Sequence, residues 1–76
     1  MEERMSEASV QTVIQGHPRY ACRVHYHAMR GQVYFDYSVL VDRKIDEEIG
    51  YEAGMLGISE AVYCVAEEEA LEVATC

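Results

Sequence analysis

Two segments of the chain alternate between apolar and polar side chains with a period of two. In residues 20–28 the apolar positions are Tyr20, Cys22, Val24, Tyr26 and Ala28. In residues 33–41 they are Val33, Phe35, Tyr37, Val39 and Val41. Because successive side chains of a strand point to opposite faces of a sheet, this pattern predicts two half-buried strands that form a hairpin.

A turn at Arg30 and Gly31 predicts the register of this hairpin. The expected facing pairs are Tyr26 with Phe35, His25 with Asp36, His27 with Tyr34 and Arg23 with Ser38. A slip of one residue would turn one apolar set toward solvent, so the pattern specifies the register strongly. We expect Phe35 on the covered face, where Phe35→Ala would cost about 3–5 kcal/mol.

Upstream, residues 9–15 contain the β-branched side chains Val10, Thr12, Val13 and Ile14 before a break at residues 16–18. This composition favours a third strand, which would complete an antiparallel meander. A helix through Met5, Ala8 and Val13 is the competing interpretation. A two-stranded sheet alone would be marginally stable, which favours the strand.

The period changes in the second half of the chain. Ile45, Ile49, Ala53 and Leu56 recur at helical spacing, which predicts a helix that starts near Asp42 and ends at Gly57. The glycines at positions 50 and 54 weaken this prediction.

Ser59 can cap a second helix. The expected inward positions of this helix are Val62, Tyr63, Ala66, Ala70, Val73 and Ala74. Residues 61–65 could instead form a buried strand, but residues 66–72 have a strongly helix-forming composition.

The expected element order is therefore β-β-β-α-α in a single domain over residues 1–76, because two cores would each be too small to fold. The predicted fold class is α+β, with a small antiparallel β-meander packed against an acidic helical hairpin.

Charge is segregated along the chain, whose net charge is −8. Residues 1–44 hold 5 acids and all 6 basic residues, whereas residues 45–76 hold 9 acids and no basic residue. The candidate partner-binding residues are these nine acids: Asp46, Glu47, Glu48, Glu52, Glu60, Glu67, Glu68, Glu69 and Glu72. Such a surface suits a basic protein and repels nucleic acid and anionic membranes, although acids also serve solubility alone.

Metal or catalytic chemistry is a less favoured interpretation. His25 and His27 lie two apart on one strand, close to Asp36, but a third ligand and a nucleophile are not evident. The cysteines, Cys22, Cys64 and Cys76, are odd in number and widely spaced, which favours reduced thiols over a disulfide framework. We therefore expect no enzyme, no catalytic residue, no metal and no cofactor.

Residues 53–63, which include Leu56-Gly57-Ile58-Ser59, resemble the turn of the DNA-reading helix-turn-helix family. The helix after this turn carries Glu and no Arg or Lys, so the resemblance supports the turn geometry and not DNA reading.

As a whole, the short acidic chain with its polarised charge resembles the small phage-encoded anti-CRISPR proteins directed at type I effector complexes. That resemblance implies a stoichiometric inhibitor with an acidic, DNA-mimicking face that blocks target DNA binding. The alternative is an acidic regulatory or antitoxin-like interaction module.

Because the amino terminus lacks a signal-peptide pattern and the apolar run at residues 61–66 is short, we expect a cytoplasmic protein of the host bacterial cell, as a monomer or weak homodimer.

Overall fold

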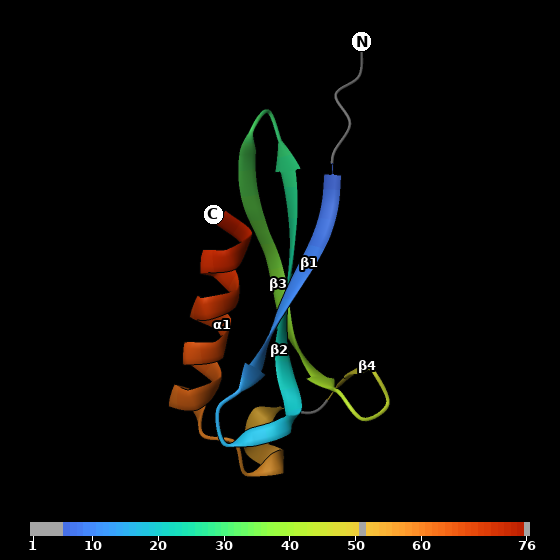
Figure 1. Ribbon diagram of the computed structural model, residues 1–76, viewed down its shortest axis with the longest axis vertical. Helices are drawn as coiled ribbons and strands as arrows, with labels where there is room; N and C mark the ends of the chain where they lie inside the picture. The colour runs from blue at the N-terminus through green and yellow to red at the C-terminus, as the bar shows by residue number, and fades with distance from the viewer. Residues whose placement is uncertain (1–5, 51, 76) are drawn as a thin grey trace.

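The computed structural model describes residues 6–50 and 52–75 (Figure 1). The elements, in chain order, are β1 (Ser6–Ile14), β2 (His17–Met29), β3 (Gln32–Asp42), β4 (Glu47–Ile49), the 3-10 helix η1 (Ala53–Leu56) and α1 (Glu60–Thr75). The strands form one antiparallel sheet in the order β1-β2-β3-β4. The α+β class is confirmed, but the helical hairpin is wrong, because α1 is the one α-helix of the described residues.

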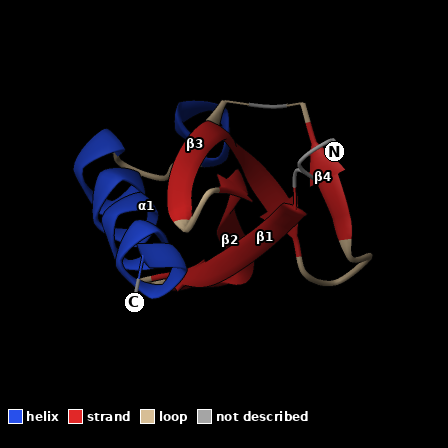
Figure 2. Cartoon of the chain, turned by 90° about the horizontal axis from the view of Figure 1, so that it is seen from above, coloured by secondary structure: helices blue, strands red, loops and turns tan. Residues whose placement is uncertain are grey.

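The sheet is curled, and α1 lies along one of its faces (Figure 2). The helix packs mainly against β1 and β2, and less against β3. The buried core between them consists of Ile14, Cys22, Val24, Leu40, Ile58, Ala66 and Ala70. We call the opposite face, which no helix covers within the described residues, the open face of the sheet.

The sheet is longer than the helix that covers it. The longest dimension is 48 Å, and the tip of the β2–β3 hairpin extends beyond the carboxyl end of α1 (Figure 1). In this distal hairpin, defined as residues 26–35, Phe35 is 51% exposed and Val33 is 38% exposed. Phe35 lies on the face that packs against α1 but beyond the end of the helix, so the expectation that it is covered is wrong.

The predicted register is confirmed only near the turn. Tyr26 pairs with Phe35 and His27 with Tyr34 as expected, but the register shifts between His25 and Tyr26. Asp36 is the extra residue of a β-bulge in β3. The local backbone fits the turn, since Arg30 and Gly31 both have positive φ, at 55° and 76°.

The bulge exchanges the two faces of β3 from residue 37 onward. His25 now pairs with Tyr37 and Arg23 with Val39, so the expected pairs with Asp36 and Ser38 are wrong. Val39 and Val41 consequently share a face with Arg23 and not with the core cluster. Leu40, expected to face outward, is 3% exposed in the core beneath α1.

The amino-terminal segment is a strand and not a helix. β1 pairs with β2 from Ser6 opposite Ala28 to Val13 opposite Ala21, which confirms the meander. It begins at Ser6, three residues earlier than predicted.

The predicted helix between residues 42 and 56 is wrong. Asp46 has φ of 53°, which ends any right-handed helix there, and β4 follows directly. The apolar spacing of Ile45 and Ile49 is equally compatible with a turn and a short strand, and these β-branched residues favour strands. Only η1 remains helical, and Gly57 ends it with φ of 77°, as expected.

The last helix is confirmed, and the strand alternative for residues 61–65 is wrong. The N–H of Val62 donates to Ser59 Oγ at 3.2 Å, so Ser59 caps α1. Ala66 and Ala70 are buried as predicted, whereas Val73 is 59% exposed. Cys22 is buried and Cys64 is exposed. Cys76 lies outside the described residues.

Candidate functional site: the acidic surface of α1

The nine candidate acids do not form one surface, because the segment before η1 is not a helix. Four of them lie in the β3–β4 turn, in β4 or just before η1: Asp46, Glu47, Glu48 and Glu52. The other five lie on α1: Glu60, Glu67, Glu68, Glu69 and Glu72. The electrostatic surroundings of these two groups differ.

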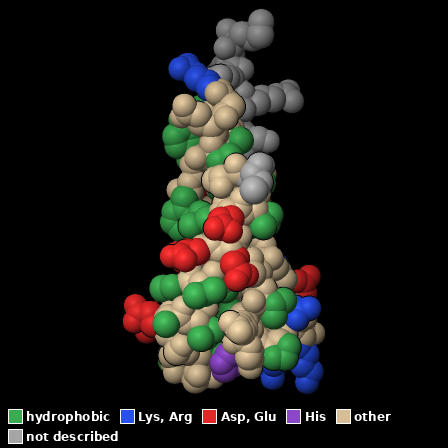
Figure 3. Space-filling model, turned by 60° about the vertical axis from the view of Figure 1, so that its left-hand side comes forward, with side chains coloured by type: hydrophobic (Ala, Val, Ile, Leu, Met, Phe, Trp, Pro, Cys, Tyr) green, Lys and Arg blue, Asp and Glu red, His purple; other side chains and the backbone are tan. Residues whose placement is uncertain are grey.

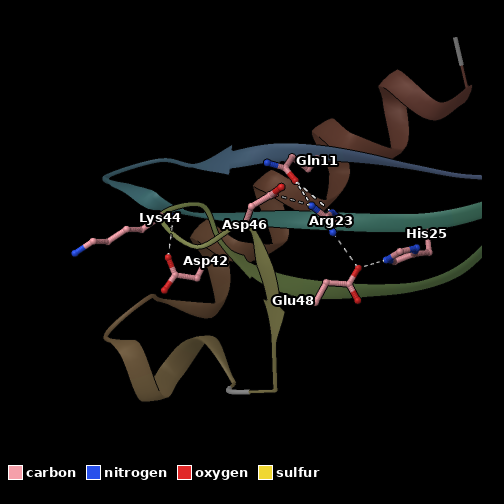
Figure 4. Close-up of polar contacts among 7 residues, drawn as sticks. All are labelled: Gln11, Arg23, His25, Asp42, Lys44, Asp46 and Glu48. Carbon is pink, nitrogen blue, oxygen red and sulfur yellow. Dashed lines mark hydrogen bonds and ion pairs between the residues drawn. The ribbon is translucent and has the colours of Figure 1, made fainter.

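On the open face, Arg23 forms ion pairs with two acids of the first group. Arg23 lies between Gln11, Asp46 and Glu48 (Figure 4). Its guanidinium donates to Gln11 Oε1 at 2.9 Å, and ion pairs join it to Glu48 at 3.3 Å and Asp46 at 3.5 Å. Glu48 also contacts His25 Nε2. These two acids are therefore poor candidates for attracting a basic partner.

The surroundings of Glu48 also change its acidity. The hydrogen bond with His25 holds the pKa of this carboxyl below its usual range, and the bond from Arg23 adds to the effect. Glu48 thereby links the three-residue strand β4 to two side chains of β2, across β3.

A second histidine and carboxylate pair lies further along the open face. His27 Nδ1 is 2.8 Å from Asp36 Oδ1, at the bulge. Each imidazole also stacks on a tyrosine: His25 on Tyr37 with ring centroids 4.4 Å apart, and His27 on Tyr34 at 5.1 Å.

The two histidines of the metal alternative contact different carboxylates. Among residues 6–50 and 52–75, no group of three or more His, Cys, Asp or Glu side chains is arranged to hold a metal ion. His25 and His27 each have a carboxylate of their own, instead of converging on one point.

The acids of α1 have different surroundings. Glu68, Glu69 and Glu72 are exposed, and none of the ion pairs within the described part of the chain involves an acid of α1. Figure 3 shows acidic side chains gathered on this side of the molecule, with hydrophobic side chains between them. We call Glu60, Glu68, Glu69 and Glu72 the α1 acidic surface.

Glu67 has a structural contact at the border of this surface. It accepts a hydrogen bond from Ser38 Oγ at 2.6 Å, and Ser38 accepts one from the Tyr63 hydroxyl at 3.4 Å. Burial raises the pKa of Tyr63 to about 12, so this hydroxyl remains a donor at neutral pH. The three residues connect α1 to β3, a role that the sequence pattern did not reveal because Ser38 was expected to face outward.

A groove lies beside the amino end of α1, between β3, β4 and η1. It has a volume of about 570 Å³, an apolar floor that includes Leu40 and Ile58, and the acids Glu52 and Glu60 among its lining residues. This groove extends the acidic character of the helix toward the short strand β4.

No family model, curated protein or solved structure matches this chain. Within residues 6–50 and 52–75, neither η1 nor α1 is long and apolar enough to span a membrane.

Proposed function

We propose that this protein is a stoichiometric inhibitor whose α1 acidic surface binds a basic, nucleic-acid-binding surface of another protein. The observation that carries the proposal is the contrast in charge pairing. Arg23 forms ion pairs with two acids of the open face, Asp46 and Glu48, whereas the acids of α1 have no cationic partner among the described residues. A field of one sign on an exposed helix attracts and orients an oppositely charged partner.

The profile resemblance to small acidic anti-CRISPR proteins makes a type I effector complex of the host bacterial cytoplasm the first partner to test. In this proposal the protein occupies the channel that holds target DNA. Binding of nucleic acid by the protein itself is not proposed, because α1 contains no basic residue.

The spacing of the acids limits the mimicry of DNA to a short stretch. The four acids of the α1 acidic surface, along the 16 residues of α1 or about 24 Å of helix, correspond to one charge per ~6 Å. Duplex DNA carries one charge per ~1.7 Å and a single strand one per ~3.4 Å. The α1 acidic surface can therefore replace a few phosphates of one strand.

The second candidate function is an acidic regulatory or antitoxin-like interaction module without DNA mimicry. The exposed side chain of Val65 favours it, since this residue lies among the acids and is 46% exposed. An apolar contact of this kind suits a protein surface better than a phosphate-binding channel.

A matched pair of charge reversals tests the proposal. Glu68→Lys with Glu72→Lys removes the centre of the α1 acidic surface, and Glu7→Lys with Glu47→Lys makes the same charge change on β1 and β4. We expect the α1 variant to lose at least about tenfold in inhibitory potency, while the control keeps most of it. Equal potency of the two variants would contradict the proposal.

Competition with duplex DNA for the isolated effector complex separates the two candidate functions. Inhibition by mimicry decreases as DNA is added and as salt is raised, because both ligands need the same basic site. Inhibition that DNA does not relieve would favour the regulatory module.

A further inference from the structure

The outer edge of β1 is a long strand edge with no pairing strand within the described residues. β1 has nine residues, and its register with β2 is unbroken from Ser6 to Val13. Glu7 is its one charged residue, and it contains no Lys, Arg or Pro. Soluble proteins usually protect such edges with charges, prolines or bulges.

The opposite side of the sheet has that protection. The edge there consists of β4, which has only three residues, and of residues 32–39 of β3, which carry the bulge at Asp36. A bulge and a very short edge strand both discourage pairing with another chain. The two edges therefore differ, and β1 is the one suited to accept a strand.

We propose that two copies of this chain pair through β1 in antiparallel orientation and form one continuous eight-stranded sheet. The sequence of β1 is compatible with itself in this arrangement. Pairing centred on Ser9 places Glu7 opposite Gln11, and pairing centred on Val10 places it opposite Val13. In neither register do like charges face each other across the two strands.

The two-fold axis of such a pair is perpendicular to the shared sheet and keeps both helices on one face. Each helix then lies beside the distal part of the partner's sheet, which the partner's α1 leaves uncovered.

Glu67 marks the side of α1 that faces β3, through its hydrogen bond with Ser38. Val65 and Val73 lie about 160° and 120° around the helix from it, on the side toward β1. They are 46% and 59% exposed in the single chain, and the pair gives them cover.

Charge opposes this association. Each copy carries a net charge of −8, and Glu69 lies on the same side of α1 as the two valines. Added salt screens this repulsion, so the pairing strengthens as ionic strength rises. Binding of a basic partner has the opposite salt dependence, so either proposal can fail without the other.

Sedimentation of the full chain over a wide concentration range, at low and high salt, tests the pairing. We expect the mass to double from the 8.6 kDa of one chain as concentration and salt increase. Ser9→Lys places a charge on the edge and should weaken the association about tenfold or more. The control Met55→Lys makes the same charge change on η1, where Met55 is 71% exposed, and should dimerise like the wild type. A single-chain mass under all conditions, or equal dimerisation of the two variants, would overturn the proposal.

Cross-linking tests the orientation of the strands. In a chain with Cys64→Ser and Cys76→Ser, we expect Ser9→Cys to cross-link efficiently with a short bismaleimide. Gln32→Cys is the control, because antiparallel pairing puts the two hairpin tips more than about 25 Å apart. Cross-linking through position 32 and not through position 9 would contradict the antiparallel arrangement.

Discussion

The two ends of β3 lie on the same sheet yet differ in what covers them. Leu40, near the carboxyl end of the strand, is 3% exposed beneath α1, whereas Phe35, five residues earlier, is 51% exposed. Both side chains belong to the face that packs on α1, because the bulge at Asp36 compensates for their odd separation. The difference shows that alternation in a strand identifies a face, while the length of the covering element decides which part of that face is buried.

The largest effect that tests this comparison is expected at Leu40. Leu40→Ala should cost about 2–5 kcal/mol, because it leaves a cavity in the core cluster. A domain of this size has only about 3–5 kcal/mol of net stability, so the variant should be largely unfolded at room temperature. Urea denaturation followed by circular dichroism measures the loss. A fully folded variant would mean that α1 does not seal this end of the sheet.

An intermediate effect is expected from acid. The bidentate hydrogen bond from Arg19 holds the pKa of Asp42 below its usual range, and His25 has the same effect on Glu48. A carboxyl whose pKa is lowered on folding stabilises the folded state above its unfolded pKa of about 4, and this contribution disappears as the pH falls through the folded value. Melting temperature should therefore decrease as pH is lowered from about 5 toward 2.

Variants assign this acid effect to its residues. Asp42→Asn and Glu48→Gln should each flatten the decrease in melting temperature, because the amide no longer titrates. Glu68→Gln is the matched control, since Glu68 forms no ion pair within the described residues. If Glu68→Gln flattens the decrease in melting temperature as much as Glu48→Gln does, the acid effect does not come from the ion pairs of the open face.

The smallest effect is expected at Phe35. Because about half of this side chain is already exposed, Phe35→Ala should cost about 1 kcal/mol, well below the cost of the same truncation in a core. The same denaturation experiment that tests Leu40→Ala measures it. A loss as large as that of Leu40→Ala would show that the distal hairpin is covered in solution.

The sequence was informative where a single physical constraint decided the structure. The turn at Arg30 and Gly31 determined the pairing of Tyr26 with Phe35, and Ser59 determined the start of α1. The bulge could not be predicted, because Tyr37, Val39 and Val41 continue the apolar alternation of Val33 and Phe35. The inward positions are instead taken by Ser38, Leu40 and Asp42, and the polar residues among them favoured the opposite assignment.

The candidate site was predicted in part, for a related reason. The acidic character of α1 follows directly from its residues, but assigning all nine acids to one helical hairpin required a helix before Gly57. The positive φ of Asp46 and the strand β4 exclude that helix. The contacts of Glu48 depend on Arg23 and His25, which are distant in the sequence and meet it only through the pairing of β2, β3 and β4.

The bulge at Asp36 also bears on how this gene tolerates change. Deleting the single codon for Asp36 would remove one residue and restore an uninterrupted pairing of β2 with β3. His25 would still pair with Tyr37 and Cys22 with Leu40, so every side chain from Tyr37 to Val41 would keep its present face. Leu40 would stay beneath α1, and the change would be confined to the contact of Asp36 with His27. The bulge is therefore a position at which such a chain could lose one residue without repacking its core.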